Sequence, residues 1–135
     1  MKTTPENITE LQNSQVFVFG SNESGIHGGG AAKTALKWGA EWGNPVGLQG
    51  NTYAIPTKNK EISKTLSIEE IGRYVNRFIR FTEENHDLEF LVTEIGCGLA
   101  GLKPKDVAPL FKSAIELPNV SLPKRFINQI RKEDV

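Results

Sequence analysis

Residues 16–43 read VFVFGSNESGIHGGGAAKTALKWGAEWG, and the residue types change twice along this stretch. The run VFVF at 16–19 is apolar throughout, which is typical of a strand that is covered on both faces. A glycine-rich loop follows, and the segment from Gly29 or Gly30 to Ala40 favours a helix. Glycines allow an anion to approach the backbone closely, and the start of a helix offers unpaired N–H groups. This order of elements predicts an anion-binding loop between a buried strand and a helix.

A second glycine-rich loop has the same setting further along the chain. The apolar run LEFLVTEI at 88–95 predicts a strand, and GCGLAGLKP follows it directly. Residues 104–117 favour a helix with Pro104 in its first turn, where the missing N–H costs little. Ligands of open α/β sheets bind at the carboxyl edge of the strands. Two loops at that edge indicate one elongated ligand that is contacted twice, and a diphosphate fits this description.

The remaining patterns complete an alternation of strands and helices. TYAIP at 52–56 predicts a strand that Pro56 stops, and NVSLP at 119–123 predicts a short last strand. Ser67 and Glu70 have the spacing of a capping box at the start of a helix. Strands that alternate with helices imply a mostly parallel sheet with helices on both faces. The apolar residues that recur at helical spacing after the capping box are Ile68, Ile71, Val75, Phe78 and Ile79.

The composition is that of one ordinary globular domain. The chain has 135 residues, 38% of them hydrophobic, and its 16 basic and 16 acidic side chains leave no net charge. Domains that bind nucleic acid usually concentrate positive charge, so this balance argues against a dedicated nucleic-acid surface. We expect a single domain over 1–135, with a loop or short helix at 1–14, a loop at 39–51 and a helix or tail at 124–135.

The sequence offers no support for membrane, disulfide or metal chemistry. No apolar run approaches the roughly 20 residues that span a bilayer, and MKTTPENITE at the N-terminus has no hydrophobic signal segment. Cys97 is the only cysteine, which excludes an internal disulfide and a multi-cysteine metal site. We expect a cytoplasmic protein that uses neither a metal nor a cofactor.

Three familiar motifs do not account for the two loops. Lys33 and Thr34 match the end of a P-loop, but Ala32 and His27 stand where that motif needs glycine. Residues 96–101 match G-x-G-x-x-G, but they lie in the last third of the chain, which is a poor context for a dinucleotide-binding fold. A G-x-S-x-G nucleophile elbow is absent. Phosphate binding therefore remains the prediction, without any of these three folds.

The loops and the strand between them resemble the macro-domain family. GSNESGIHGGGAAKTAL at 20–36 is similar to the signature loop of a macro domain, and GNTYAIPTK at 50–58 to the family's middle strand, which also ends in a proline. FLVTEIGCGLAGL at 90–102 is similar to the strand and loop that wrap the diphosphate of ADP-ribose in that family. The resemblance covers 16–117 and implies a three-layer αβα sandwich with a mostly parallel, mixed sheet. It also implies a chain that is shortened at its N-terminus, because the asparagine-bearing strand comes almost first.

The resemblance assigns the ligand-binding residues. Asn22 matches the asparagine beside the distal ribose, although it could also be an ordinary turn residue. The glycines of the first loop would frame that ribose and the neighbouring phosphate, and the second loop would donate backbone N–H groups to the diphosphate. The expected ligand-binding residues are Asn22, His27, Gly28, Gly29, Gly30, Gly96, Cys97, Gly98, Leu99, Ala100 and Gly101.

The resemblance also puts the usual hydrolase chemistry in question. Macro domains that remove ADP-ribose carry an aspartate in a G-G-V-D pattern, and Ala32 stands at that position here. The paired glutamates of poly(ADP-ribose) glycohydrolases are absent from this loop. A pair of Cys97 and His27 is conceivable, but a buried, inert cysteine is the better interpretation. The candidate catalytic residues, each taken singly, are His27, Lys33 and Glu94.

The sequence therefore predicts binding, and possible processing, of ADP-ribose or a related NAD-derived nucleotide, either free or attached to a macromolecule. One alternative is a hydrolase that removes ADP-ribose from a macromolecule with non-standard residues. The other is a non-catalytic assembly protein on a macro-like scaffold. The adenine base has no clear partner, although it could stack on Trp38, Trp42, Tyr53 or Phe111, for each of which core packing is the alternative. The oligomeric state is left open.

Overall fold

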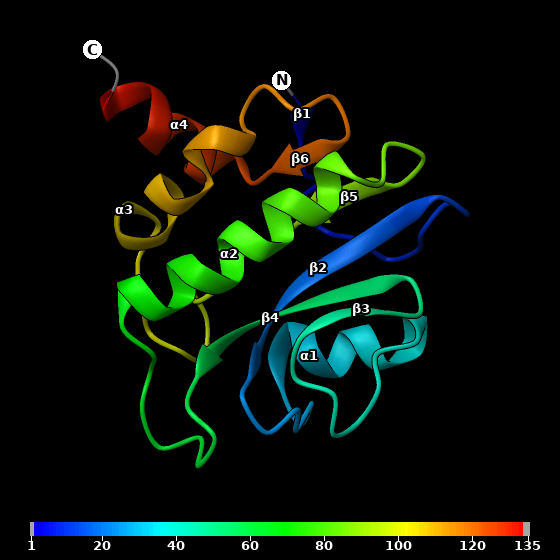
Figure 1. Ribbon diagram of the computed structural model, residues 1–135, viewed down its shortest axis with the longest axis vertical. Coiled ribbons are helices and arrows are strands. Elements are labelled where there is room, and N and C mark those ends of the chain that lie inside the picture. Colours follow the sequence, from blue (N-terminus) through cyan, green and yellow to red (C-terminus); the bar gives the residue numbers. More distant parts are fainter. Residues whose placement is uncertain (1, 134–135) are drawn as a thin grey trace.

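The computed structural model describes residues 2–133, which form a six-stranded sheet with helices on both faces (Figure 1). The strands are β1 (Lys2–Thr3), β2 (Gln15–Asn22), β3 (Gly47–Gln49), β4 (Thr52–Lys58), β5 (Glu89–Val92) and β6 (Val120–Leu122). The α-helices are α1 (Gly30–Ala35), α2 (Ile68–Glu83), α3 (Pro104–Val107) and α4 (Lys124–Glu133). Two 3₁₀ helices, η1 (Leu36–Trp38) and η2 (Ala108–Ala114), continue α1 and α3.

The sheet is mixed and mostly parallel, as the sequence predicted. Its strand order is β1-β6-β5-β2-β4-β3, and every neighbouring pair is parallel except β3 with β4. The two strands that precede the glycine-rich loops, β2 and β5, are direct neighbours, with Val18 opposite Val92. Both loops therefore leave the same edge of the sheet next to each other.

Alternating residues of the central strands supply two separate cores. Val16 and Val18 face the larger core, which contains the buried residues of α2, η2 and α4. Phe17 and Phe19 face the opposite layer, where they pack with the alanines of α1. In Figure 1, α2 crosses in front of the sheet and α1 lies behind it. These three layers make an αβα sandwich, the predicted fold class.

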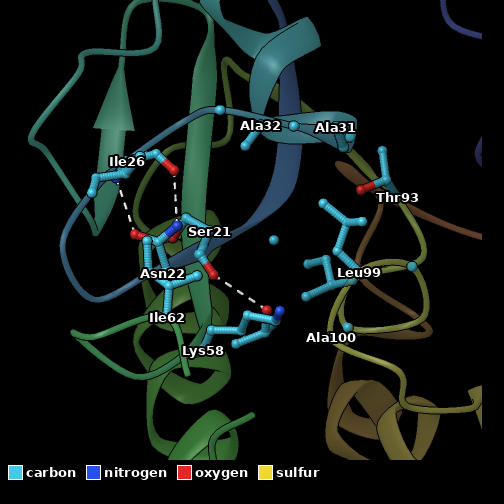
Figure 2. Close-up of a pocket in the computed structure, with 18 of the residues that line it drawn as sticks. Ser21, Asn22, Ile26, Ala31, Ala32, Lys58, Ile62, Thr93, Leu99 and Ala100 are labelled. Carbon is cyan, nitrogen blue, oxygen red and sulfur yellow. Dashed lines mark hydrogen bonds between the residues drawn. The ribbon is translucent and has the colours of Figure 1, made fainter. Parts of the chain in front are cut away.

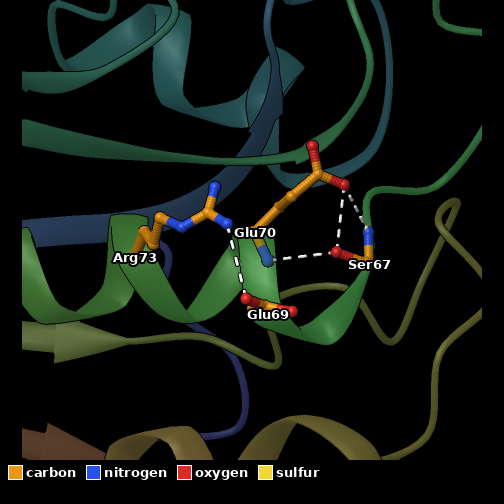
Figure 3. A network of polar contacts seen from close by, with 4 residues as sticks. All are labelled: Ser67, Glu69, Glu70 and Arg73. Atoms are coloured by element: carbon orange, nitrogen blue, oxygen red, sulfur yellow. Dashed lines mark hydrogen bonds and ion pairs between the residues drawn. The ribbon is translucent and has the colours of Figure 1, made fainter.

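The start of α2 has the predicted capping box (Figure 3). The Ser67 hydroxyl accepts a hydrogen bond from the Glu70 N–H at 3.1 Å, and the Glu70 carboxylate accepts one from the Ser67 N–H at 3.1 Å. Two of the N–H groups that lack a helical partner are thereby satisfied. Ile68, which was expected on the buried stripe, is 37% exposed because it occupies the first turn, outside the core. The buried stripe consists of Ile71, Val75, Phe78, Ile79 and Thr82.

The predicted end of the second strand was wrong. β4 continues through Pro56 to Lys58. Only Thr52–Ala54 of β4 pairs with β3, so the missing N–H of Pro56 removes no bond from that ladder. The continuation matters for function, because it carries Lys58 to the edge where the two loops lie.

Other boundaries also differ from the predictions. Part of the expected loop 39–51 forms edge strand β3, and part of the expected loop 1–14 forms β1, which pairs with β6. Strand β5 ends at Val92 because the chain turns at once, with the Ile95 N–H donating to the Thr93 carbonyl at 2.8 Å. The predicted helix over 104–117 is α3 followed by η2. The predicted C-terminal helix or tail is α4, and its residues 134 and 135 lie outside the described residues. No helix among the described residues is long and apolar enough to cross a membrane.

Candidate ligand-binding site

A pocket of about 650 Å³ lies where β2, β4 and β5 end (Figure 2). The first glycine-rich loop, the end of β4 and the second glycine-rich loop each supply part of its wall. Figure 2 shows Asn22 and Lys58 on one side, with Leu99 and Ala100 on the other. The lining residues from the three segments are Gly20, Ser21, Asn22, Ile26, Gly28, Gly29, Gly30, Ala31 and Ala32; Thr57, Lys58 and Ile62; and Thr93, Glu94, Ile95, Gly96, Gly98, Leu99 and Ala100.

Asn22 organises the first loop. Its Oδ1 accepts a hydrogen bond from the Ile26 N–H at 3.0 Å, and its Nδ2 donates to the Ile26 carbonyl at 2.8 Å. An amide side chain has two donor hydrogens, so one N–H of Asn22 is still available to a ligand. The side chain thus has the turn-forming role of an asparagine and also lines the pocket.

Gly25 allows this loop to pack against the chain before β3. Its φ is +72°, and the Gly43 N–H donates to its carbonyl at 2.8 Å. A Cβ at position 25 would lie only 2.5 Å from the Asn44 nitrogen, closer than any side chain can come. Glycine is therefore required here for both conformation and space.

The second loop brings residues with unused backbone N–H groups to the pocket wall. Its internal hydrogen bonds run from Cys97 N–H to the Glu94 carbonyl (3.1 Å), from Gly101 N–H to the Gly98 carbonyl (3.0 Å) and from Leu102 N–H to the Gly96 carbonyl (2.8 Å). Within the described part of the chain, the N–H groups between these, of Gly98, Leu99 and Ala100, have no backbone acceptor. All three of these residues line the pocket. Successive free amides of this kind form an anion-binding concavity.

The two loops nearly touch across the mouth of the pocket. Leu99 is 75% exposed, and its Cδ1 lies 3.2 Å from the position that a Cβ would take on Gly29. The absence of a side chain on Gly29 therefore determines how closely Leu99 can approach. A ligand between the loops would lie beneath this contact.

A β-bulge shapes the third wall. The register between β2 and β4 shifts between Ser21 and Asn22, so that Asn22 pairs with Lys58. Thr57 donates a hydrogen bond from Oγ1 to the Ser21 carbonyl at 3.2 Å. Consecutive side chains of a regular strand point to opposite faces, yet both Thr57 and Lys58 line the pocket. The bulge thus turns Lys58 toward the site.

Lys58 and Glu94 are the only charged residues among the described residues that line this pocket. The Arg125 guanidinium holds the Glu94 carboxylate through two hydrogen bonds and lowers the pKa of Glu94 below its ordinary value. A general acid at neutral pH needs a raised pKa, so Glu94 is a carboxylate rather than a proton donor. Lys58 then provides the positive charge of the pocket.

A second, larger cavity of about 1190 Å³ adjoins the first. The two share Ala31, Thr93 and Glu94 as lining residues, so they lie side by side, and together they are termed the groove. The second cavity is built from the chain before β2, the end of β5 and the start of α4. Its other lining residues are Thr3, Thr4, Pro5, Glu6, Asn7, Ile8, Thr9, Phe17, Thr34, Val92, Pro123, Lys124 and Arg125.

The structure brings most of the predicted binding residues together and leaves others outside. One pocket is lined by predicted ligand-binding residues from both loops, which lie far apart in the sequence. They are Asn22, Gly28, Gly29, Gly30, Gly96, Gly98, Leu99 and Ala100. His27, Cys97 and Gly101 do not line it. Of the catalytic candidates, Glu94 lines the pocket, whereas Lys33 is exposed and His27 is buried elsewhere.

His27 packs in the core behind the first loop. It has no exposed surface, and its Nε2 lies 3.3 Å from Gln49 Oε1. Its ring packs edge-to-face with the ring of Phe19, and the two ring centroids are 5.3 Å apart. Among the described residues, none forms a hydrogen bond with His27 Nδ1. These contacts are those of a packing residue rather than of a proton-transfer group.

Cys97 faces the larger core instead of His27. It packs against that core's buried residues, and its Sγ lies 3.6 Å from the Ile95 carbonyl oxygen. Burial, reinforced by the negative charge of Glu94, raises the pKa of the Cys97 thiol to about 11. The thiol is therefore protonated at neutral pH and is a poor nucleophile.

Several residues of the groove were not predicted from the sequence. Lys58 and Ile62 line the first pocket, and Phe17 and Arg125 line the second. Lys58 could have been found, because it is the last residue of a strand that ends at the same edge as the two loops. None of the aromatic residues considered for adenine, Trp38, Trp42, Tyr53 and Phe111, lines either cavity. Among residues 2–133, no cluster of three or more side chains suits a metal ion.

Comparison with known proteins identifies the fold. A search of protein-family models and one of curated proteins return no match. Among solved structures, the chain is similar to the macrodomain of Mycobacterium tuberculosis DarG, with a TM-score of 0.67 and 20% sequence identity. The similarity covers 91% of this chain and 95% of that chain. The chain thus has the macrodomain fold, as its resemblance to that family predicted.

Proposed function

We propose that this chain, which has the macrodomain fold, binds ADP-ribose or a related NAD-derived nucleotide in the groove formed by its two cavities. The observation that carries the proposal is the convergence of two glycine-rich loops from separate crossovers on one pocket. The fold suggests an ADP-ribose-related ligand in general terms. The geometry of this chain suggests where each part of such a ligand would lie.

The diphosphate would bind between the two loops. The free N–H groups of Gly98, Leu99 and Ala100 suit phosphate oxygens, and the glycines of the first loop leave room on the facing side. Lys58 adds one positive charge at the same pocket. Backbone amides make most of these contacts, which fits a chain without net charge.

The two ends of the ligand would then lie on either side of the diphosphate. The sugar on the far side would reach Asn22, whose spare N–H can donate to a hydroxyl. The adenosine would occupy the second cavity, where Pro5 and Ile8 provide apolar surface. The two cavities adjoin at Ala31 and Thr93, which supports an elongated ligand that occupies both.

A hydrolase that removes ADP-ribose from a macromolecule is the second candidate. The observation in its favour is that two ionisable side chains, Lys58 and Glu94, line the pocket. Ala32 supplies no acid at the position of the usual catalytic aspartate. Binding without turnover is the function that these observations support better. An assembly role with a plugged cleft is disfavoured, because the pocket is open.

Titration calorimetry tests the binding proposal. ADP-ribose, ADP and AMP are titrated separately into the protein, and Gly98→Val serves as the site variant. A Cβ at position 98 meets no atom within 4 Å, so this variant should fold and still obstruct the phosphate site. We expect ADP-ribose to bind the wild type and to lose at least about tenfold in affinity in the variant, a difference of about 1.4 kcal/mol. Absence of heat with the wild type at millimolar ligand would overturn the proposal.

Turnover is tested by incubation with an ADP-ribosylated protein and an ADP-ribosylated oligonucleotide. Release of ADP-ribose by the wild type that is lost in both Lys58→Ala and Glu94→Gln would favour the hydrolase. If the wild type and both variants release no more ADP-ribose than a protein-free sample does, the hydrolase is excluded and binding is left as the function. Measuring ADP-ribose affinity of the two variants separates a loss of chemistry from a loss of binding.

A further inference from the structure

Ile62 has an unusual backbone conformation. Its φ is +60°, and no other non-glycine residue among the described ones has a positive φ. The left-handed region is costly for any L-residue and most costly for a β-branched one. Such strain persists only where the surrounding structure imposes it, and it often marks a functional wall or clamp.

The turn that contains Ile62 imposes this conformation. The Ile62 N–H donates to the Asn59 carbonyl at 3.0 Å, and the Asn59 N–H donates to the Lys64 carbonyl at 2.9 Å. Asn59 Oδ1 also accepts from the N–H groups of Ser63 (2.9 Å) and Lys64 (3.2 Å). Loops of this kind usually have glycine or asparagine at the left-handed position. Here the position holds isoleucine.

The same segment is tied to both glycine-rich loops. At one end, the Ser24 hydroxyl donates to the Lys60 carbonyl, and the Glu23 N–H donates to the Lys58 carbonyl at 3.0 Å. At the other end, the Thr65 hydroxyl donates to the Ala100 carbonyl at 2.6 Å. The segment 58–65, which contains the turn, is therefore hydrogen-bonded to both loops, and these bonds restrain the turn.

The side chain of Ile62 lines the pocket. Figure 2 shows it on the side of Asn22 and Lys58, opposite Leu99 and Ala100. Asn22, Lys58 and Ile62 line this pocket and not the second cavity, so they belong to the part of the wall that the two cavities do not share. Ile62 therefore adds an apolar side chain to the wall that also contains Asn22 and Lys58.

We propose that the turn over 59–64 holds Ile62 in a strained conformation so that its side chain forms the end wall for the terminal sugar of the ligand. Ile62 is thus a specificity-determining residue, which favours ADP-ribose over nucleotides that stop at the diphosphate. This inference rests on the proposed function, because it assumes that ADP-ribose occupies the groove. It goes further in assigning to one residue the discrimination between ADP-ribose and ADP.

Binding measurements on Ile62→Ala and Ile62→Gly test the wall. We expect both variants to lose about three- to tenfold in affinity for ADP-ribose, as removal of one buried apolar contact would cause. Their affinity for ADP should stay within about twofold of the wild type, because ADP has no terminal sugar. Ile68→Ala is the matched control, since Ile68 is also an isoleucine and lines neither cavity.

Thermal unfolding of the same variants tests the strain. At an ordinary exposed position alanine is more stable than glycine, whereas at a left-handed position the order reverses. We expect a higher Tm for Ile62→Gly than for Ile62→Ala. Lys60 is an exposed neighbour without a positive φ, so Lys60→Ala should melt above Lys60→Gly.

The outcomes distinguish this inference from the proposed function. Failure of the wild type to bind ADP-ribose would overturn both. Binding by the wild type with unchanged ADP-ribose affinity in both Ile62 variants would overturn the wall alone. Equal losses for ADP and ADP-ribose, or a Tm of Ile62→Gly below that of Ile62→Ala, would also overturn it.

Discussion

Arg125, in the first turn of α4, donates two hydrogen bonds to the carboxylate of Glu94. Its Nε lies 2.6 Å from Oε2, and one Nη lies 2.5 Å from Oε1. This pair joins the C-terminal helix to the end of β5, at the place where the two cavities meet. The two hydrogen bonds favour the ionised form of Glu94, so its side chain is a poor proton donor.

The pair predicts a pH-dependent contribution to stability. The folded-state pKa of Glu94 is lowered, chiefly by its hydrogen bonds with Arg125, so the contribution is complete above the ordinary pKa and is lost as the pH falls through the folded-state pKa. We expect Arg125→Ala to lower Tm at about pH 7 and the difference from the wild type to shrink below about pH 4. Melting curves across this range measure it. Arg131→Ala, an exposed arginine of the same helix, should show no such trend.

Leu99 predicts a separation of binding from stability. Because the side chain is 75% exposed, Leu99→Ala should change the free energy of unfolding by less than about 0.5 kcal/mol. The same change removes the contact across the mouth of the pocket, so ADP affinity should fall about three- to tenfold. Calorimetry and chemical denaturation check the two values. Leu48→Ala, at an exposed leucine outside both cavities, should leave both unchanged, and a large loss of stability in Leu99→Ala would contradict the assignment.

His27 predicts the opposite pattern. Its side chain is fully buried against Phe19, so His27→Ala should lower the free energy of unfolding by roughly 2–5 kcal/mol, the range for a large buried side chain. At a temperature where the variant is folded, its ADP-ribose affinity should match that of the wild type. Lys33→Ala, which removes an exposed side chain, should affect neither property. Loss of binding in folded His27→Ala would restore His27 as a site residue.

Gly25 and Gly43 have similar φ, but we expect alanine to destabilise the protein by different amounts at the two positions. Gly25 (φ +72°) would place a Cβ 2.5 Å from the Asn44 nitrogen, whereas Gly43 (φ +89°) has open space around that position. Gly25→Ala should therefore be less stable than Gly43→Ala by at least about 1 kcal/mol, because it adds a clash to the conformational cost. Urea denaturation of the two variants measures the difference. Equal stabilities would show that the chain before β3 can move aside.

The sequence predicted what depends on local patterns. The apolar run of β2, the capping box of Ser67 and the helical period after it led directly to the three layers. Two glycine-rich loops after neighbouring strands predicted one shared pocket, because the carboxyl ends of parallel strands lie at one edge. These conclusions needed no knowledge of side-chain packing.

The remainder depended on contacts between distant residues. Pro56 was expected to end its strand, and only the short extent of β3 explains why it does not. His27 sits among site residues in the sequence, but its ring is buried against Phe19 and Gln49, which only the folded structure reveals. Ile62 lies in a polar loop sequence, and its place in the pocket follows from hydrogen bonds to both glycine-rich loops.

The pairing of β1 with β6 has a consequence for how the protein folds. Lys2 lies opposite Ser121, so this pair of strands can form only after nearly the whole chain has been gathered together. Closing so long a segment is entropically costly and slows folding. The same termini supply Thr3, Thr4, Pro123 and Lys124 to the second cavity. Nucleotide capture should accordingly be among the last properties to appear during refolding, and in stopped-flow experiments it should lag behind the burial of the central strands.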